Sequence, residues 1–93
     1  MNEILINPNP PSLSKAYSIG YRWDPAAPND VVHLSVVITH SDGSIEGMSI
    51  LLECPTYTDT KWSLGLYAPE GASSISVTDV THNANLLTRL FVP

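Results

Sequence analysis

Cysteine and basic side chains are scarce in this chain of 93 residues. It has one cysteine, four lysine and arginine residues against nine acidic residues, and a formal net charge of −5. A single cysteine excludes an internal disulfide and a cysteine-based zinc cluster. The basic residues are scattered singly, so no basic stripe is present to neutralise nucleic-acid phosphates, and acidic lipid headgroups repel an anionic surface. We therefore expect neither direct nucleic-acid binding nor membrane binding.

Long apolar runs and secretion signals are also missing from the sequence. No segment approaches the ~20 apolar residues that a membrane-spanning helix needs. Residues 1–6 carry an acidic residue where a signal peptide has a basic one, and their apolar run is short. No asparagine stands in an N-glycosylation motif. These observations lead us to expect a reducing, cytoplasmic setting.

Apolar residues are plentiful: 43% of the chain is hydrophobic and only 14% is charged. This balance predicts one small globular domain spanning residues 1–93. The eight prolines and three of the five glycines fall outside the apolar segments, as in proteins built from strands and turns. Residues 7–14 begin with Asn-Pro-Asn-Pro-Pro, and we expect an extended, proline-rich lead-in there because proline cannot donate to a strand ladder.

Period-two alternation is the main structural signal. Residues 17–23 have large apolar or aromatic side chains at odd positions and Ser, Gly or Arg at even ones, which predicts a strand with one buried face. Similar segments cover residues 31–40, 48–54, 61–68 and 74–80. Residues 86–92 fit a short amphipathic helix or a strand, and we predict a strand because so short a terminal helix is marginal.

Six to seven short strands joined by turns predict an all-β fold, a small antiparallel β-sandwich. An immunoglobulin-like arrangement is our first choice, and a small closed β-barrel is the alternative. Tyr17, Tyr21, Trp23 and Trp62 are expected in the core.

The Asp-Gly pair at residues 42–43 indicates a hairpin, and its loop length decides the register. A three-residue loop over residues 41–43 pairs Val36 with Met48 and keeps both apolar faces on one side. A two-residue turn would slip the register by one residue. That slip would expose about four large apolar side chains at ~1.5–3 kcal/mol each, so we predict the three-residue loop.

Residues able to carry chemistry are few. His33 and His40 are an odd number apart within one predicted strand, so they project from opposite faces and cannot bind one metal ion. Ser76, His82 and Asp79 could in principle form a Ser-His-Asp catalytic triad. A chain with this many serines and acids always contains such a combination, so it is no evidence for catalysis. Cys54 is expected to be a buried, inert thiol. We predict no catalytic residues, no metal, no cofactor and no enzymatic activity.

The predicted hairpin has an unusual second face. Its residues are neither charged nor cleanly polar, whereas a solvated sheet face usually carries Lys, Glu and Arg. Either a partner covers this face or other strands of the chain do. The candidate partner-binding residues are His33, Ser35, Val37, Thr39, Ile45, Ser49 and Leu51, with Tyr57 in a nearby threonine-rich loop.

Three functions agree with these features. The first is a non-enzymatic protein-binding or assembly domain that uses the uncharged sheet face or loops, with self-association into a homo-oligomer as one form. The second is a carbohydrate-binding module that uses exposed Tyr and Trp rings. The third is a small acidic inhibitor that docks on a basic groove of a target protein. The inhibitor would need its acids on one face, namely Asp24, Asp30, Glu46, Asp59, Glu70 and Asp79.

Overall fold

The computed structural model describes residues 3–23, 31–53, 61–82 and 84–93. These residues form seven β-strands and no helix. The strands are β1 (Glu3–Asn7), β2 (Ala16–Arg22), β3 (Val31–His40), β4 (Ile45–Glu53), β5 (Lys61–Tyr67), β6 (Ala72–Asp79) and β7 (Ala84–Leu90). No helix in this part of the chain is long and apolar enough to cross a membrane.

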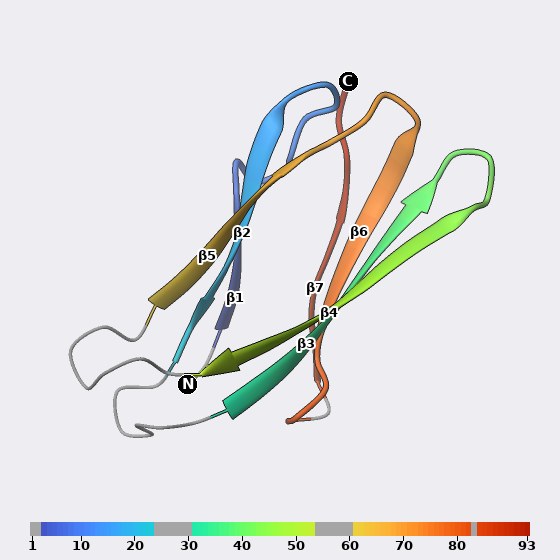
Figure 1. Cartoon of the computed structure of the whole chain (residues 1–93). Helices are drawn as coiled ribbons and strands as arrows, with labels where there is room; N and C mark the ends of the chain where they lie inside the picture. The colour runs from blue at the N-terminus through green and yellow to red at the C-terminus, as the bar shows by residue number, and fades with distance from the viewer. Residues whose placement is uncertain (1–2, 24–30, 54–60, 83) are drawn as a thin grey trace.

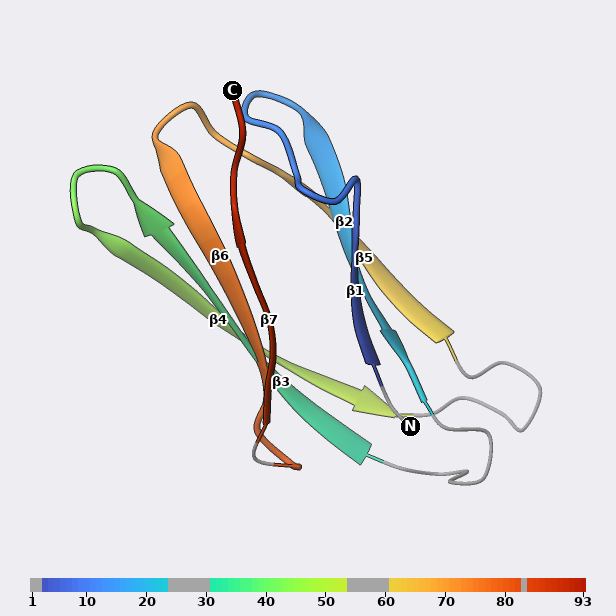
Figure 2. The same ribbon diagram turned by 180° about the vertical axis from the view of Figure 1, so that it is seen from behind.

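The strands divide into two antiparallel sheets that lie face to face (Figures 1 and 2). One sheet has the order β1-β2-β5 and the other the order β4-β3-β6-β7. Two separate sheets confirm the predicted all-β fold and a small antiparallel sandwich rather than a closed barrel. The immunoglobulin-like arrangement stays a prediction.

The core lies between the two sheets because alternate residues of each strand point inward. Tyr17, Tyr21 and Trp23 are buried there, as predicted, and Trp62 is half-buried against the core. Tyr21 and Trp23 meet edge to face with ring centroids 4.9 Å apart, and Tyr17 meets Phe91 in the same way at 5.5 Å. The aliphatic part of the core comes mainly from Ile19, Val32, Leu34, Val36, Ile75 and Val77.

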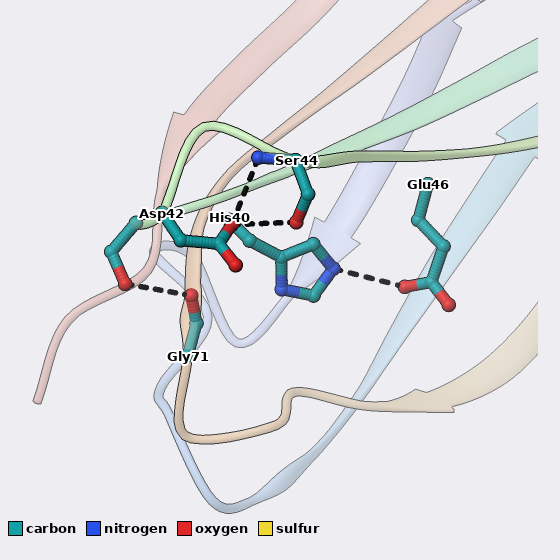
Figure 3. Close-up of polar contacts among 6 residues, drawn as sticks. His40, Asp42, Ser44, Glu46 and Gly71 are labelled. Atoms are coloured by element: carbon teal, nitrogen blue, oxygen red, sulfur yellow. Dashed lines mark hydrogen bonds and ion pairs between the residues drawn. The ribbon is translucent and has the colours of Figure 1, made fainter.

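The β3–β4 hairpin has the predicted register, with Val36 opposite Met48. Gly43 has a φ of 90°, a backbone conformation that favours glycine. The backbone N–H of His40 donates to the Ser44 carbonyl at 2.9 Å, which closes the three-residue loop. The Asp42 carboxylate accepts hydrogen bonds from the Ser44 backbone N–H and hydroxyl at 2.8 and 2.6 Å (Figure 3).

Met48 is less covered than the sequence pattern suggests. It lies on the core side of β4, yet its side chain is 38% exposed. The reason is its position: β4 is the outermost strand of its sheet, and the hairpin turn projects away from the three-stranded sheet (Figure 1). Of the described β4 residues, only Leu52 is fully buried.

The two ends of the chain hold further differences from the sequence prediction. β1 was not predicted as a strand, and it shares Asn7 with the expected lead-in. Past β1, the chain crosses to the other sheet, where Val92 donates to the Pro11 carbonyl at 3.0 Å and accepts from the Leu13 N–H at 2.7 Å. β7 is a strand, as predicted for residues 86–92, but it begins at Ala84 and ends at Leu90.

Candidate interaction surface

The face of the four-stranded sheet that points away from the core, here called the outer face, carries the predicted partner-binding residues. The register places His33 opposite Leu51, Ser35 opposite Ser49, and Thr39 opposite Ile45. Val37 completes the row on β3. The β3 residues are half-buried and the β4 residues are exposed. Tyr57 lies outside the described residues.

The outer face continues over β6 and β7, which the sequence analysis did not include. Val37 is opposite Ser76, and Ser76 is opposite Thr88, with the two hydroxyl oxygens 3.2 Å apart. Ser74 in turn lies between Thr39 and Leu90. The alternating serines of β6 were visible in the sequence, but their place beside β3 depends on a long-range pairing that no local pattern reveals.

Charge is nearly absent from the outer face. Among the described outward positions of the four strands, Glu53 at the end of β4 is the one charged residue. The rest are hydroxyl residues, aliphatic residues, one glycine and His33. Several aliphatic side chains are well exposed, among them Ile45 at 71%, Leu51 at 67% and Leu90 at 69%. Depletion of charge with exposed aliphatics is the composition found in the centre of protein interfaces.

A second polar arrangement lies at the far end of β6, inside the sandwich. The Asp79 side chain is completely buried. Its carboxylate accepts hydrogen bonds from the Tyr21 hydroxyl at 2.8 Å and from the His82 backbone N–H at 3.0 Å, and its Oδ2 lies 2.5 Å from His82 Nδ1. Burial raises the pKa of this carboxyl, but the hydrogen bonds from His82 and Tyr21 and the His82 charge outweigh burial. The pKa therefore lies below its usual value of 3.8.

Ser76 does not lie beside Asp79 and His82 to complete a Ser-His-Asp triad. Ser76 is on the outer face, whereas Asp79, three residues later on the same strand, points into the core. The trio written from the sequence is therefore not assembled. Asp79 and His82 instead tie the start of the β6–β7 connection to the interior.

Metal-ligating residues do not gather in the described part of the chain: no group of three His, Cys, Asp or Glu side chains lies close enough there to hold an ion. His33 belongs to the outer face, while His40 contacts Glu46 with 3.2 Å between Nε2 and Oε2 (Figure 3). Cys54 lies outside the described residues.

The aromatic residues bear on the carbohydrate-binding alternative. Tyr67, at the end of β5, is 62% exposed, while Trp23 is buried. A groove of about 280 Å³ lies on the three-stranded sheet and includes the outward-facing Ser18, Gly20 and Ser63. Its lining residues are Leu5, Asn7, Ser18, Gly20, Tyr21, Trp62 and Ser63. Carbohydrate binding stays a prediction.

The acidic residues bear on the inhibitor alternative. Asp79 is buried and so cannot contribute to an acidic surface, and Glu46 faces His40. Glu70 lies in the β5–β6 turn. The remaining acids named for that function, Asp24, Asp30 and Asp59, lie outside the described residues. Inhibition of a basic target stays a prediction.

The chain matches no protein-family model, no curated protein and no solved structure.

Proposed function

We propose that this domain is a non-enzymatic protein-binding or assembly module that docks through the outer face of its four-stranded sheet. The observation that supports the proposal is the near absence of charge at the described outward positions of the four strands, together with the exposed aliphatic side chains of Ile45, Leu51 and Leu90. Burying one such side chain on association is worth about 1.5–3 kcal/mol.

The hydroxyl groups of the outer face can form hydrogen bonds with a protein partner as well as with water. Ser35, Ser49 and Ser74 carry short side chains that leave the sheet surface flat, and each hydroxyl can donate and accept a hydrogen bond. A flat surface with few long side chains loses little rotamer entropy when a partner covers it. The outer face therefore combines apolar area with a low ordering cost.

A matched pair of serine substitutions tests the proposal. Ser35→Lys places a charge in the middle of the outer face, and Ser63→Lys places the same charge on the outward side of the other sheet. The tagged domain and both variants are used to capture proteins from a lysate of the source organism, and circular dichroism verifies that both variants are folded. We expect Ser63→Lys to retain the bound protein and Ser35→Lys to lose it, since burying an unpaired ammonium is costly. Equal retention by the two variants would contradict docking through the outer face.

A further inference from the structure

The outermost strand β4 exposes one whole backbone edge. It pairs with β3 on one side, and no described strand pairs with it on the other. Strands at such edges usually carry proline, lysine, an inward-pointing charge or a bulge, which hinder pairing with another chain. β4 has no proline, lysine or bulge over its nine residues, and its one inward-side charge, Glu46, contacts His40 of β3. β7, at the opposite edge, is protected by a register shift, and Val92 just after it bonds to Pro11 and Leu13.

The free backbone groups of β4 belong to its odd-numbered residues. His40 donates to Ser44 in the hairpin, so even-numbered residues of β3 and β4 bond to each other, and odd-numbered residues point the other way. The bond from the Val80 N–H to the His33 carbonyl agrees, because it shows an odd residue of β3 bonding on the side away from β4. Ile45, Gly47, Ser49, Leu51 and Glu53 therefore present N–H and C=O groups at the open edge.

We propose that β4 pairs antiparallel with β4 of a second copy of this chain, about a twofold axis at Ser49. This inference goes beyond the proposed function, because the second copy pairs at the edge of the sheet and leaves the outer face open to a protein partner. A twofold axis perpendicular to the sheet keeps inner side chains on the inner side, so odd residues must pair with odd residues. With Ser49 at the axis, all the free groups from Ile45 to Glu53 find hydrogen-bond partners.

The side chains of β4 complement one another in this register. Gly47 lies opposite Leu51 of the second copy, and a methyl group at Gly47 would meet only the Val36 carbonyl at 3.9 Å, which leaves room for the leucine. On the inner side, Met48 lies opposite Ile50 of the second copy, so the exposed part of Met48 becomes covered. Each pair removes apolar surface from water.

The charges of β4 also favour this register. Glu46 and Glu53 lie opposite Leu52 and Ile45 of the second copy rather than opposite each other. A slip by one residue would bring Glu46 opposite Glu53, and like charges in direct opposition are destabilising. The same slip would also turn the side chains to the wrong faces. The paired edges then form one sheet with four strands from each copy, and the two outer faces become continuous.

Disulfide trapping tests the geometry. In a Cys54→Ser background, which removes the single native cysteine, Ser49→Cys places a thiol at the axis, and Val37→Cys places one in the middle of the outer face, away from the edge. Directly opposed residues in a hydrogen-bonded antiparallel pair have Cα atoms ~5.5 Å apart, which suits a disulfide. We expect mild oxidation to convert the Ser49→Cys variant to a covalent dimer and to leave the Val37→Cys variant monomeric.

Light scattering on the native sequence at two concentrations supplies the second measurement. We expect a mass approaching twice the 10.1 kDa of one chain at the higher concentration. Ser49→Pro should halve it, because proline removes a free N–H without touching the bonds to β3. Ser49→Thr, which keeps the N–H, should leave the mass unchanged.

Two outcomes would overturn the inference. One is a native chain that stays monomeric at both concentrations, and the other is cross-linking of the Val37→Cys variant without cross-linking of the Ser49→Cys variant. Neither outcome removes the proposed function, whose own test is the loss of a bound protein from the Ser35→Lys variant. Conversely, a dimer that forms through β4 while Ser35→Lys binds its partner normally would contradict docking through the outer face.

Discussion

The Tyr21 hydroxyl donates a hydrogen bond of 2.8 Å to the buried carboxylate of Asp79, joining β2 of one sheet to β6 of the other. The two residues are 58 positions apart in the sequence. The same carboxylate accepts the backbone N–H of His82. One acidic side chain therefore links the two sheets and the β6–β7 connection.

Replacing Asp79 should cost more stability than removing one of its donors. Asp79→Ala deletes the acceptor shared by Tyr21 and His82 and leaves a cavity, so we expect the free energy of unfolding to fall by about 3 kcal/mol. Tyr21→Phe keeps the ring in the core and removes only one donor, for an expected loss of about 1 kcal/mol. Urea denaturation measures both values. Equal losses would show that Asp79 acts only through Tyr21.

The lowered pKa of Asp79 predicts a loss of stability in acid. In the unfolded chain this carboxyl takes up a proton near its usual pKa of 3.8, whereas in the folded protein it does so only at lower pH. Its contribution is therefore complete above the unfolded pKa and is lost as the pH falls through the folded pKa. Native protein and Asp79→Asn should differ most at neutral pH and converge below about pH 4.

The pH experiment needs a control for Asp42. Hydrogen bonds from the Ser44 hydroxyl and backbone N–H lower the pKa of this exposed carboxyl as well. An Asp42→Asn variant, measured over the same pH range, separates the contribution of Asp42 to the acid-dependent loss of stability from that of Asp79. An Asp79→Asn variant that still lost as much stability as the native protein on acidification would contradict a role for the buried carboxylate.

Much of the sandwich was predictable because its signals are local. Strict alternation over residues 17–23 identified the inward side chains of β2. The Asp42–Gly43 pair indicated the hairpin, and keeping the apolar faces of its two strands on one side predicted the register. β1 was not predicted as a strand because its apolar run is short and its strand structure depends on pairing with β2. The hydrogen bonds of Asp79 were not predictable either, because only the packing of the two sheets brings Tyr21 to this carboxylate.

The outer face was half predictable. The hairpin register alone gave its β3 and β4 rows, down to Ser35 opposite Ser49. The rows from β6 and β7 depend on the pairing of Val37 with Ser76, a contact between strands far apart in the sequence. The exposure of Met48 was missed because alternation reports which way a side chain points and not whether another strand covers it.

Gly43 should tolerate substitution poorly. Its φ of 90° lies where a side chain is strained, so Gly43→Ala should lower the free energy of unfolding by about 1 kcal/mol. Gly71 is the matched control, because it also lies in a turn, has open space around it and does not have a positive φ. Gly71→Ala should change stability little. Equal effects in urea denaturation would argue against strain at Gly43 as the cause.

Gly20 and Gly65 offer a comparison on the outward side of the three-stranded sheet. A methyl group at Gly20 would lie 3.2 Å from the backbone carbonyl oxygen of Trp62, whereas one at Gly65 would meet nothing within 4 Å. Both glycines lie inside strands, where alanine restricts the unfolded chain more than glycine does.

The two substitutions should therefore have opposite signs. Gly65→Ala should raise the free energy of unfolding by about 0.5 kcal/mol. Gly20→Ala should lower it, because the crowding atom belongs to the backbone of β5 and can move away only if β2 and β5 separate slightly. Thermal or urea denaturation of both variants measures the difference. A stabilising Gly20→Ala would mean that β5 shifts without cost, and the groove lined by Gly20 could then be narrowed without loss of the fold.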